Sequence, residues 1–409
     1  MGIVGRLDQY GSMIIGEFDE TTANSPSITG FGTYYSSEFS ENVGIGTTLF
    51  ANVFPPYDIL YDEFAGVSYG PGQGTFMRHN TDKSVIVYNE IDEITSINTD
   101  LYSFTTFTFT NGGATGANGP TSFASQSNYT SQSWYTSYFS VASGIQSWTV
   151  PTTGSYQITA VGASGGENNG GTFYPGRPGQ GATIKGTFSL TQGTVLSIVV
   201  GQRGVYGSNG SGGGGGSFVY TGSIGGAGLL IAAGGGGGWG HGSASYTTGA
   251  LGGGGSATTS PVAGTSSPGT AGSKGTGEGG LGGTETGFGS AGGGAGWLSN
   301  GDRGQGTGLY RSFGGTRWVG GSPDGTGAVG ANTGEGGFGG GAGWGGNNGA
   351  AGGGGGYSGG GGGNGWNGTS WGAGAGAGSY NSGTNQTNTA GTTGQSSEWS
   401  HGSVTITKL

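Results

Sequence analysis

The chain has 409 residues, of which 109 are glycine, only 8% are charged and none is cysteine. Its formal net charge is −10, which argues against nucleic-acid binding, because that function needs basic residues to neutralise phosphates. The absence of cysteine excludes disulfides, thiolate metal sites and cysteine nucleophiles, and it fits a chain that folds in a reducing cytoplasm.

Residues 1–103 are predicted to form a small β-rich domain. Short runs of aromatic and β-branched residues alternate there with turn signals, a pattern typical of strands, and the runs are 31–39, 47–54, 74–79 and 84–91. Residues 1–100 hold 14 of the 21 acidic residues and only 3 of the 11 basic ones. Because the carboxylate spacing matches no metal-binding loop, we interpret them as solvated turns and expect no metal site.

Residues 104–233, together with 400–409, are predicted to form a β sandwich or jelly roll. No stretch keeps a helical period, and strands are expected at 104–110, 133–141, 145–150, 155–163, 182–190, 194–202, 217–220, 229–233 and 403–409. The apolar runs LSIVV and LLIAA are too short to cross a bilayer, and no signal peptide is visible, so no membrane insertion is expected.

Residues 234–399 lie between the last two of these strands and are dominated by glycine. Such a tract is either a disordered linker or a bundle of polyproline-II helices whose backbones approach closely because there are no side chains. The strict Gly-X-Y repeat of collagen is absent. Since both ends of the tract are anchored in one sheet system, the ordered bundle is favoured.

The first part of the chain resembles virion structural proteins of marine cyanobacterial and related bacteriophages. The matching stretches are MGIVGRLDQYGSMIIGEFDETTANSPSITGFGTYYSSEFSEN and FPPYDILYDEFAGVSYGPGQGTFMRHNTDKSVIVYNEIDEIT. This resemblance implies a virion location, with attachment to other virion proteins through residues 1–103, but it implies no chemistry.

Residues 105–409 resemble the glycine-rich extracellular domain of the anaplastic lymphoma kinase and leukocyte tyrosine kinase receptors. The resemblance rests on ordered blocks, which include GIQSWTVPTTGSYQITAVGASGG, IKGTFSLTQGTVLSIVVGQRG, LLIAAGGGGG and HGSVTITKL. It implies a tumour-necrosis-factor-like β sandwich that frames a polyglycine-II bundle. The cysteines of the animal domain are absent here, so growth-factor signalling is not carried over.

Aromatic residues of the glycine-rich region are the main binding candidates, because Trp and Tyr stack on sugars and on partner loops. The candidates for binding a receptor or glycan are Trp239, Tyr310, Trp318, Tyr357, Trp366 and Trp371. Trp297 and Trp344 follow near-identical GGGAGW blocks and are interpreted as structural caps of the bundle. A structural role remains open for the others.

No catalytic set is apparent, and no cofactor is expected. The three histidines, His79, His241 and His401, have no metal or catalytic spacing and are expected at the surface. No glycine loop continues into the GK[ST] of a phosphate-binding loop. We therefore do not expect an enzyme.

These features favour a bacteriophage tail fibre or tip adhesin that folds in the host cytoplasm and displays the bundle to a host glycan or outer-membrane protein. The alternative is a purely structural virion component, such as a neck, baseplate, decoration or filament subunit, whose bundle packs copies together. A homo-oligomer, for example a trimer, is expected of a fibre.

Overall fold

A computed structural model describes five short strands of residues 1–99 and most of the chain from residue 100 onward. The described ranges are 2–7, 13–18, 76–79, 85–88, 94–97, 100–166, 177–207, 210–240, 250–265, 291–304, 314–317, 320, 334–345, 350–364, 372–394 and 399–409. The chain divides into two compact units, Met1–Leu101 and Tyr102–Leu409.

The described part of the first unit consists of two small antiparallel sheets. One pairs β1 (Gly2–Leu7) with β2 (Met13–Phe18), and the other has the order β3 (Phe76–His79), β4 (Val85–Tyr88) and β5 (Ile94–Ile97). The strands expected at 74–79 and 84–91 are therefore present as β3 and β4. Those expected at 31–39 and 47–54 lie outside the described residues.

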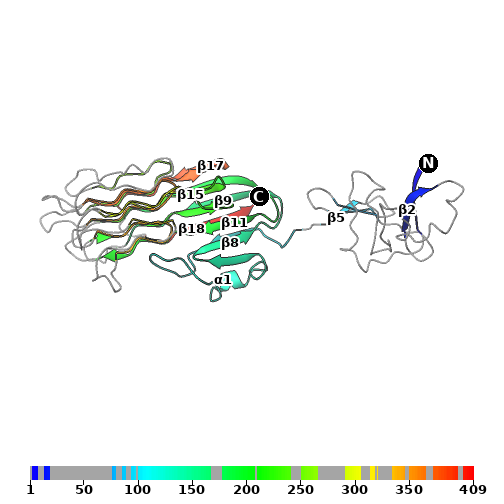
Figure 1. Ribbon diagram of the computed structural model, residues 1–409, viewed down its shortest axis with the longest axis horizontal. Coiled ribbons are helices and arrows are strands. Elements are labelled where there is room, and N and C mark those ends of the chain that lie inside the picture. The colour runs from blue at the N-terminus through cyan, green and yellow to red at the C-terminus, as the bar shows by residue number, and fades with distance from the viewer. Residues whose placement is uncertain are drawn as a thin grey trace. The chain divides into compact units, whose positions relative to one another are not determined.

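The second unit is built mainly from two antiparallel sheets, shown in Figure 1. The five-stranded sheet has the order β17 (Thr384–Thr389), β10 (Thr183–Leu190), β9 (Gly154–Val161), β18 (Ser403–Lys408) and β6 (Thr106–Phe109). The six-stranded sheet has the order β16 (Tyr380–Asn381), β15 (Leu229–Ala233), β14 (Ser217–Tyr220), β11 (Val195–Val199), β8 (Ile145–Thr149) and β7 (Phe139–Ala142). A short hairpin pairs β12 (Tyr206–Gly207) with β13 (Gly210–Ser211).

Both sheets contribute side chains to one apolar core. Burial alternates along β9, β10 and β18, as period-two strands with one buried face require. Ile158 and Ile406 of the five-stranded sheet and Leu196 and Val219 of the six-stranded sheet belong to the same buried cluster. Each such side chain that is buried stabilises the folded protein by about 1.5–3 kcal/mol.

The strand expected at 133–141 is mostly wrong. α1 (Ser127–Thr130), the one helix among the described residues, is followed by turns, and only β7 is extended. The Trp134 ring is buried 4.8 Å from the Phe107 ring, so the aromatic residues of this run form a lid on the core instead of a strand. Their β propensity is overridden by packing.

A buried polar network attaches α1 to the sheets. The backbone N–H of Thr110 donates to the Tyr129 hydroxyl at 2.7 Å, and that hydroxyl donates to Gln146 Oε1 at 2.9 Å. Gln146 Nε2 donates back to the Thr110 carbonyl at 2.9 Å. Because these buried groups have partners, their desolvation is compensated.

Two strands, β16 and β17, lie in the range that the sequence assigned to the glycine-rich tract. The six residues of β17, TNQTNT, are all exposed and all polar, so no alternation announces a strand. β17 nevertheless pairs with β10 at the edge of the five-stranded sheet, with a register shift between Lys185 and Thr187. Asn385 has a φ of 48° there, the left-handed region that Asn tolerates well.

The glycine-rich segments lie mostly outside the sheets, and we define them as 212–216, 234–238, 252–255, 291–296, 336–342, 350–363 and 372–378. Figure 1 shows several of them running side by side. Their backbone N–H groups donate to carbonyls of segments far away in the sequence, and the partner segment recurs at every third residue. Such pairs are Gly235 to Gly355 and Gly238 to Gly352, Gly213 to Ala342 and Gly216 to Gly339, and Gly353 to Gly292 and Gly356 to Ala295.

These segments approach one another too closely for side chains. A Cβ built on Gly234, Gly236 or Gly237 would collide with a carbonyl oxygen of a neighbouring segment, those of Ala377, Gly179 and Gly374 respectively. The composition of the tract is therefore a packing requirement: only glycine fits where backbone meets backbone on several sides.

Candidate functional site

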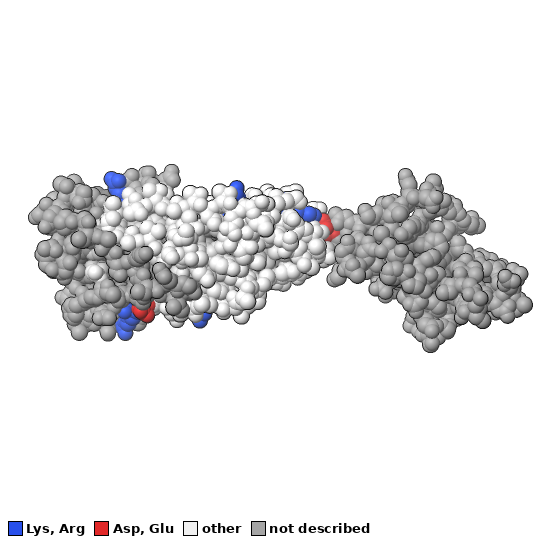
Figure 2. All heavy atoms as spheres, turned by 90° about the horizontal axis from the view of Figure 1, so that it is seen from above, with Lys and Arg blue, Asp and Glu red and all other residues white. Residues whose placement is uncertain are grey.

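The described surface of the second unit carries few charges (Figure 2). Figure 2 shows the described part of one face as almost continuous uncharged surface, with isolated Lys, Arg, Asp or Glu side chains. A surface of this kind does not attract a polyelectrolyte over long range, so recognition has to come from local features.

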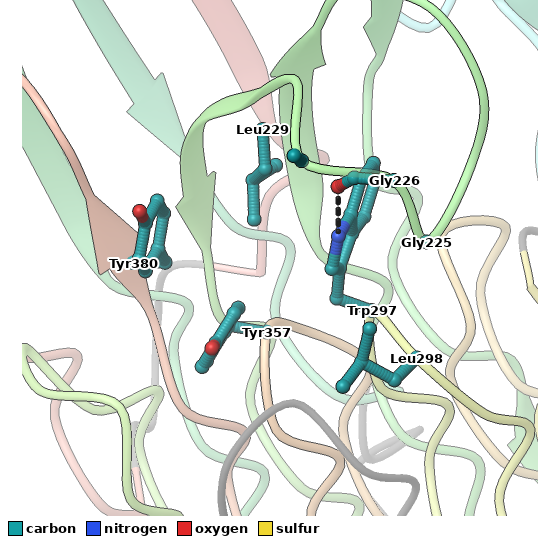
Figure 3. Close-up of a pocket in the computed structure, with 8 residues that line it drawn as sticks. Gly225, Gly226, Leu229, Trp297, Leu298, Tyr357 and Tyr380 are labelled. Atoms are coloured by element: carbon teal, nitrogen blue, oxygen red, sulfur yellow. Dashed lines mark hydrogen bonds between the residues drawn. The ribbon is translucent and has the colours of Figure 1, made fainter.

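One such local feature is a cleft of about 290 Å³ where the six-stranded sheet meets the glycine-rich segments. Three aromatic side chains line it, together with leucines and the backbone of the turn between β14 and β15, as Figure 3 shows. The lining residues are Gly225, Gly226, Ala227, Leu229, Trp297, Leu298, Tyr357 and Tyr380. We call this the aromatic cleft.

Backbone hydrogen bonds between segments bring the aromatic residues together. The N–H of Trp297 donates to the Tyr357 carbonyl at 2.8 Å, and the N–H of Tyr357 donates to the Gly378 carbonyl at 2.8 Å. Gly378 lies two residues before Tyr380, which begins β16. Three glycine-rich segments thus place one aromatic residue each at the same spot, Tyr357 from within its segment and Trp297 and Tyr380 from just after the ends of theirs.

The Trp297 ring is fixed by its surroundings. Its Nε1 donates to the Gly226 carbonyl at 3.1 Å, drawn as a dashed line in Figure 3. The ring stacks on Phe218 with centroids 6.2 Å apart and meets Tyr220 edge-on at 5.2 Å. Because only 3% of Trp297 is exposed, it forms a rigid wall of the cleft.

Tyr357 and Tyr380 form the opposite, more accessible wall. Their rings are stacked with centroids 4.9 Å apart and an interplanar angle of 23°, and both residues are partly buried. Leu298 is 46% exposed at the rim. The cleft therefore combines an ordered aromatic surface with an open mouth, and its lining residues include no His, Cys, Asp, Glu, Lys or Arg.

The structure places the predicted binding residues in different environments. Tyr357 lines the aromatic cleft, whereas Trp239 is 1% exposed and stacked on Tyr206 with centroids 6.3 Å apart. A buried ring offers no face to a ligand, so this placement weighs against a binding role for Trp239. The remaining candidates, Tyr310, Trp318, Trp366 and Trp371, lie outside the described residues.

The two tryptophans predicted to be caps occupy different environments despite their matching sequence blocks. Trp344 is buried over Gly207 and Gly334, where an added Cβ would collide with its indole ring. Trp297 is buried as well but also lines the cleft. Sequence reasoning missed Leu229, Leu298 and Tyr380 as neighbours of Tyr357, because nothing in a glycine-rich sequence indicates which segments are adjacent.

Shifted pKa values occur away from the cleft and are caused mainly by burial. Burial raises the pKa of Tyr129 to about 12 and raises that of Tyr102 far above its ordinary value. Burial, followed by the nearby Arg203, lowers the pKa of His401 to about 4. His401 is therefore not the freely exposed side chain expected from the sequence.

No group of three or more His, Cys, Asp or Glu side chains within the described ranges is arranged to hold a metal ion. Across those same ranges, no helix has the length and apolar character needed to span a bilayer. No protein-family model matches the chain.

Proposed function

We propose that the protein is a bacteriophage virion structural protein, and specifically a tail-fibre or tip adhesin. In this proposal residues 1–103 attach the chain to other virion proteins. The second unit is a tumour-necrosis-factor-like β sandwich with an inserted bundle of polyglycine-II rods, which presents a receptor-binding surface.

The observation that carries the proposal is the recurrence of a hydrogen-bonding partner at every third residue of the glycine-rich segments. A polyproline-II helix has three residues per turn and no internal hydrogen bonds, so its N–H groups point to neighbours with this same period. A bundle of such rods is rigid without a large apolar core. It is suited to holding a small binding site, such as the aromatic cleft, away from a particle.

The N-terminal sequence resemblance supports the virion location, and the aromatic cleft supports binding in preference to chemistry. Its three aromatic side chains offer the kind of surface on which sugar rings and partner loops stack. Host surface glycans and outer-membrane proteins are accordingly the proposed partners.

Two experiments test this function with the full-length protein. Gold-labelled antibodies on intact phage particles are expected to mark the distal end of a tail fibre. Fluorescently labelled protein is expected to bind whole cells of the host bacterium. Label at the neck or baseplate, with no cell binding, would instead support a purely structural virion component.

A further inference from the structure

Within the described residues, the cationic side chain of Arg317 lies next to the aromatic cleft, whose lining residues are all uncharged. Arg317 is exposed, and its Nη1 donates to the carbonyl of Trp297 at 3.5 Å. A Cβ built on Gly225 would lie 2.9 Å from the same nitrogen. Since Trp297 and Gly225 both line the cleft, the guanidinium lies next to two of its lining residues.

Arg317 is held there by its own backbone. Its N–H donates to Asn300 Oδ1 at 3.0 Å, which fixes the start of the side chain. A guanidinium carries five N–H donors in a planar fork. Within the part of the chain that the structure describes, the Trp297 carbonyl accepts from one of them. The fork geometry of the others matches a carboxylate.

The cleft itself is shaped for one small ring. Its volume of about 290 Å³ lies just below the usual range for ligand pockets, which is roughly 300–1,000 Å³. The stacked pair Tyr357 and Tyr380 faces a wall made by Trp297, so a ring with apolar C–H faces can pack against aromatic carbons. The turn at Gly225 and Gly226 adds backbone polar groups at the edge.

We propose that the aromatic cleft binds one terminal acidic sugar residue. Its ring packs against the partly exposed pair Tyr357 and Tyr380, and its carboxylate pairs with the guanidinium of Arg317. This inference rests on the proposed receptor-binding function and names the ligand class of that function. Arg317 sets the preference for an acidic over a neutral sugar, and the aromatic walls bind both.

The test compares methyl β-glucuronide with methyl β-glucoside. The two sugars differ only in that the glucuronide has a carboxylate where the glucoside has a hydroxymethyl group. Their affinities for the full-length protein are measured by calorimetric titration or by ligand-observed NMR. We expect the wild-type protein to bind the glucuronide about tenfold more tightly, as a hydrogen-bonded charge pair provides. Arg317→Gln is expected to abolish this preference and leave glucoside affinity unchanged.

Three further variants sharpen the result. Arg317→Lys keeps the charge but loses the fork, so an intermediate preference is expected. Tyr357→Ala is expected to weaken binding of both sugars, because it removes a wall. Arg177→Gln removes an exposed arginine that is not among the residues of the cleft and is expected to change neither affinity. Thermal unfolding of each variant checks that it is folded.

Equal affinities for the two sugars in the wild-type protein, binding of neither, or a preference that survives Arg317→Gln would overturn the proposal. The receptor-binding function fails separately. If wild-type protein and Arg317→Gln bind host cells equally well, the adhesin role stands and the cleft is not its site. If the glucuronide preference holds but no host cell is bound, the cleft stands and the adhesin role is lost.

Discussion

The sheets and the glycine-rich segments belong to one compact unit, yet they are stabilised in different ways. In the sheets, large side chains from two layers share an apolar core. In the glycine-rich segments, backbone groups bond directly to backbone groups of other segments, and the space that side chains would fill is absent. The stability of the sheets depends on contacts between buried side chains. The stability of the glycine-rich segments depends on the absence of side chains, which lets their backbones approach closely.

This difference predicts opposite responses to a change of volume. A core of packed side chains loses stability when atoms are removed, because a cavity is left behind. The glycine-rich segments, whose hydrogen-bonded backbones form what we call the backbone lattice, lose stability when atoms are added. The carbonyl groups there are joined to rigid neighbours and cannot move aside. Two mutations at buried positions, one that removes side-chain atoms from the apolar core and one that adds them to a glycine-rich segment, therefore test whether the two regions respond in opposite ways.

The largest effect is expected from Trp148→Ala in β8. The Trp148 side chain is fully buried and lies against the rings of Phe104 and Phe109, with centroids at 4.8 and 6.1 Å. Removing it should cost about 3–5 kcal/mol, the usual range for large aromatic residues in a core. Urea unfolding followed by far-UV circular dichroism measures the loss, with Trp148→Phe as a milder control.

A single methyl group added within the glycine-rich segments is expected to lower stability nearly as much as Trp148→Ala does. A Cβ on Gly215 would collide with the carbonyl oxygen of Phe338, and the N–H and C=O of Gly215 bond to Gln202 and Ala163. Gly215→Ala should therefore cost about 3 kcal/mol, at the upper end of the range for overpacking. The same unfolding experiment measures it, and amide exchange at Gln202 and Ala163 reports whether the damage is local.

Gly154→Ala is the matched control for this lattice variant. Gly154 begins β9, and nothing lies within 4 Å of the position that its Cβ would take. We expect a change within about 1 kcal/mol, and a stabilising one is consistent with reduced freedom of the unfolded chain. Equal losses for Gly215→Ala and Gly154→Ala would contradict the lattice interpretation.

Much of the sheet region could be predicted from the sequence because its strands alternate. Ile158 and Ile406 lie at period-two positions between polar residues, and the expected strands 155–163 and 403–409 are present as β9 and β18. The failures have physical causes. β17 was missed because its residues are polar on both faces, and the run containing Trp134 was misread because its aromatic residues pack as a lid.

The candidate site was less predictable. The sequence singled out Tyr357 and Trp297 as conspicuous aromatic residues, but for separate reasons and without placing them together. Their proximity depends on the backbone hydrogen bond between Trp297 and Tyr357, which joins residues 60 positions apart. In a tract rich in glycine, no side-chain pattern specifies which segments pair, so the cleft and the nearby Arg317 emerge only from the folded chain.

An effect smaller than those of Trp148→Ala and Gly215→Ala is expected at a junction between the two regions, where His401 precedes β18. The backbone N–H of Arg203 donates to His401 Nδ1 at 3.3 Å, so the imidazole acts as an acceptor and must stay neutral. Burial, and then the charge of Arg203, lower its pKa from 6.5 to about 4. The unfolded chain therefore binds a proton more readily than the folded one between these values.

Stability from His401 is consequently complete above pH 6.5 and is lost as the pH falls from 6.5 to 4. We expect a loss on the order of 1 kcal/mol, since the imidazole is partly exposed and water screens the effect. His401→Asn keeps a side-chain acceptor that does not titrate, so the difference in unfolding free energy between wild type and variant should change across this window and be constant above it. An NMR titration of the His401 ring that gave a midpoint near 6.5 would show instead that the junction opens to water, and that the backbone lattice is looser at its edge than the apolar core beside it.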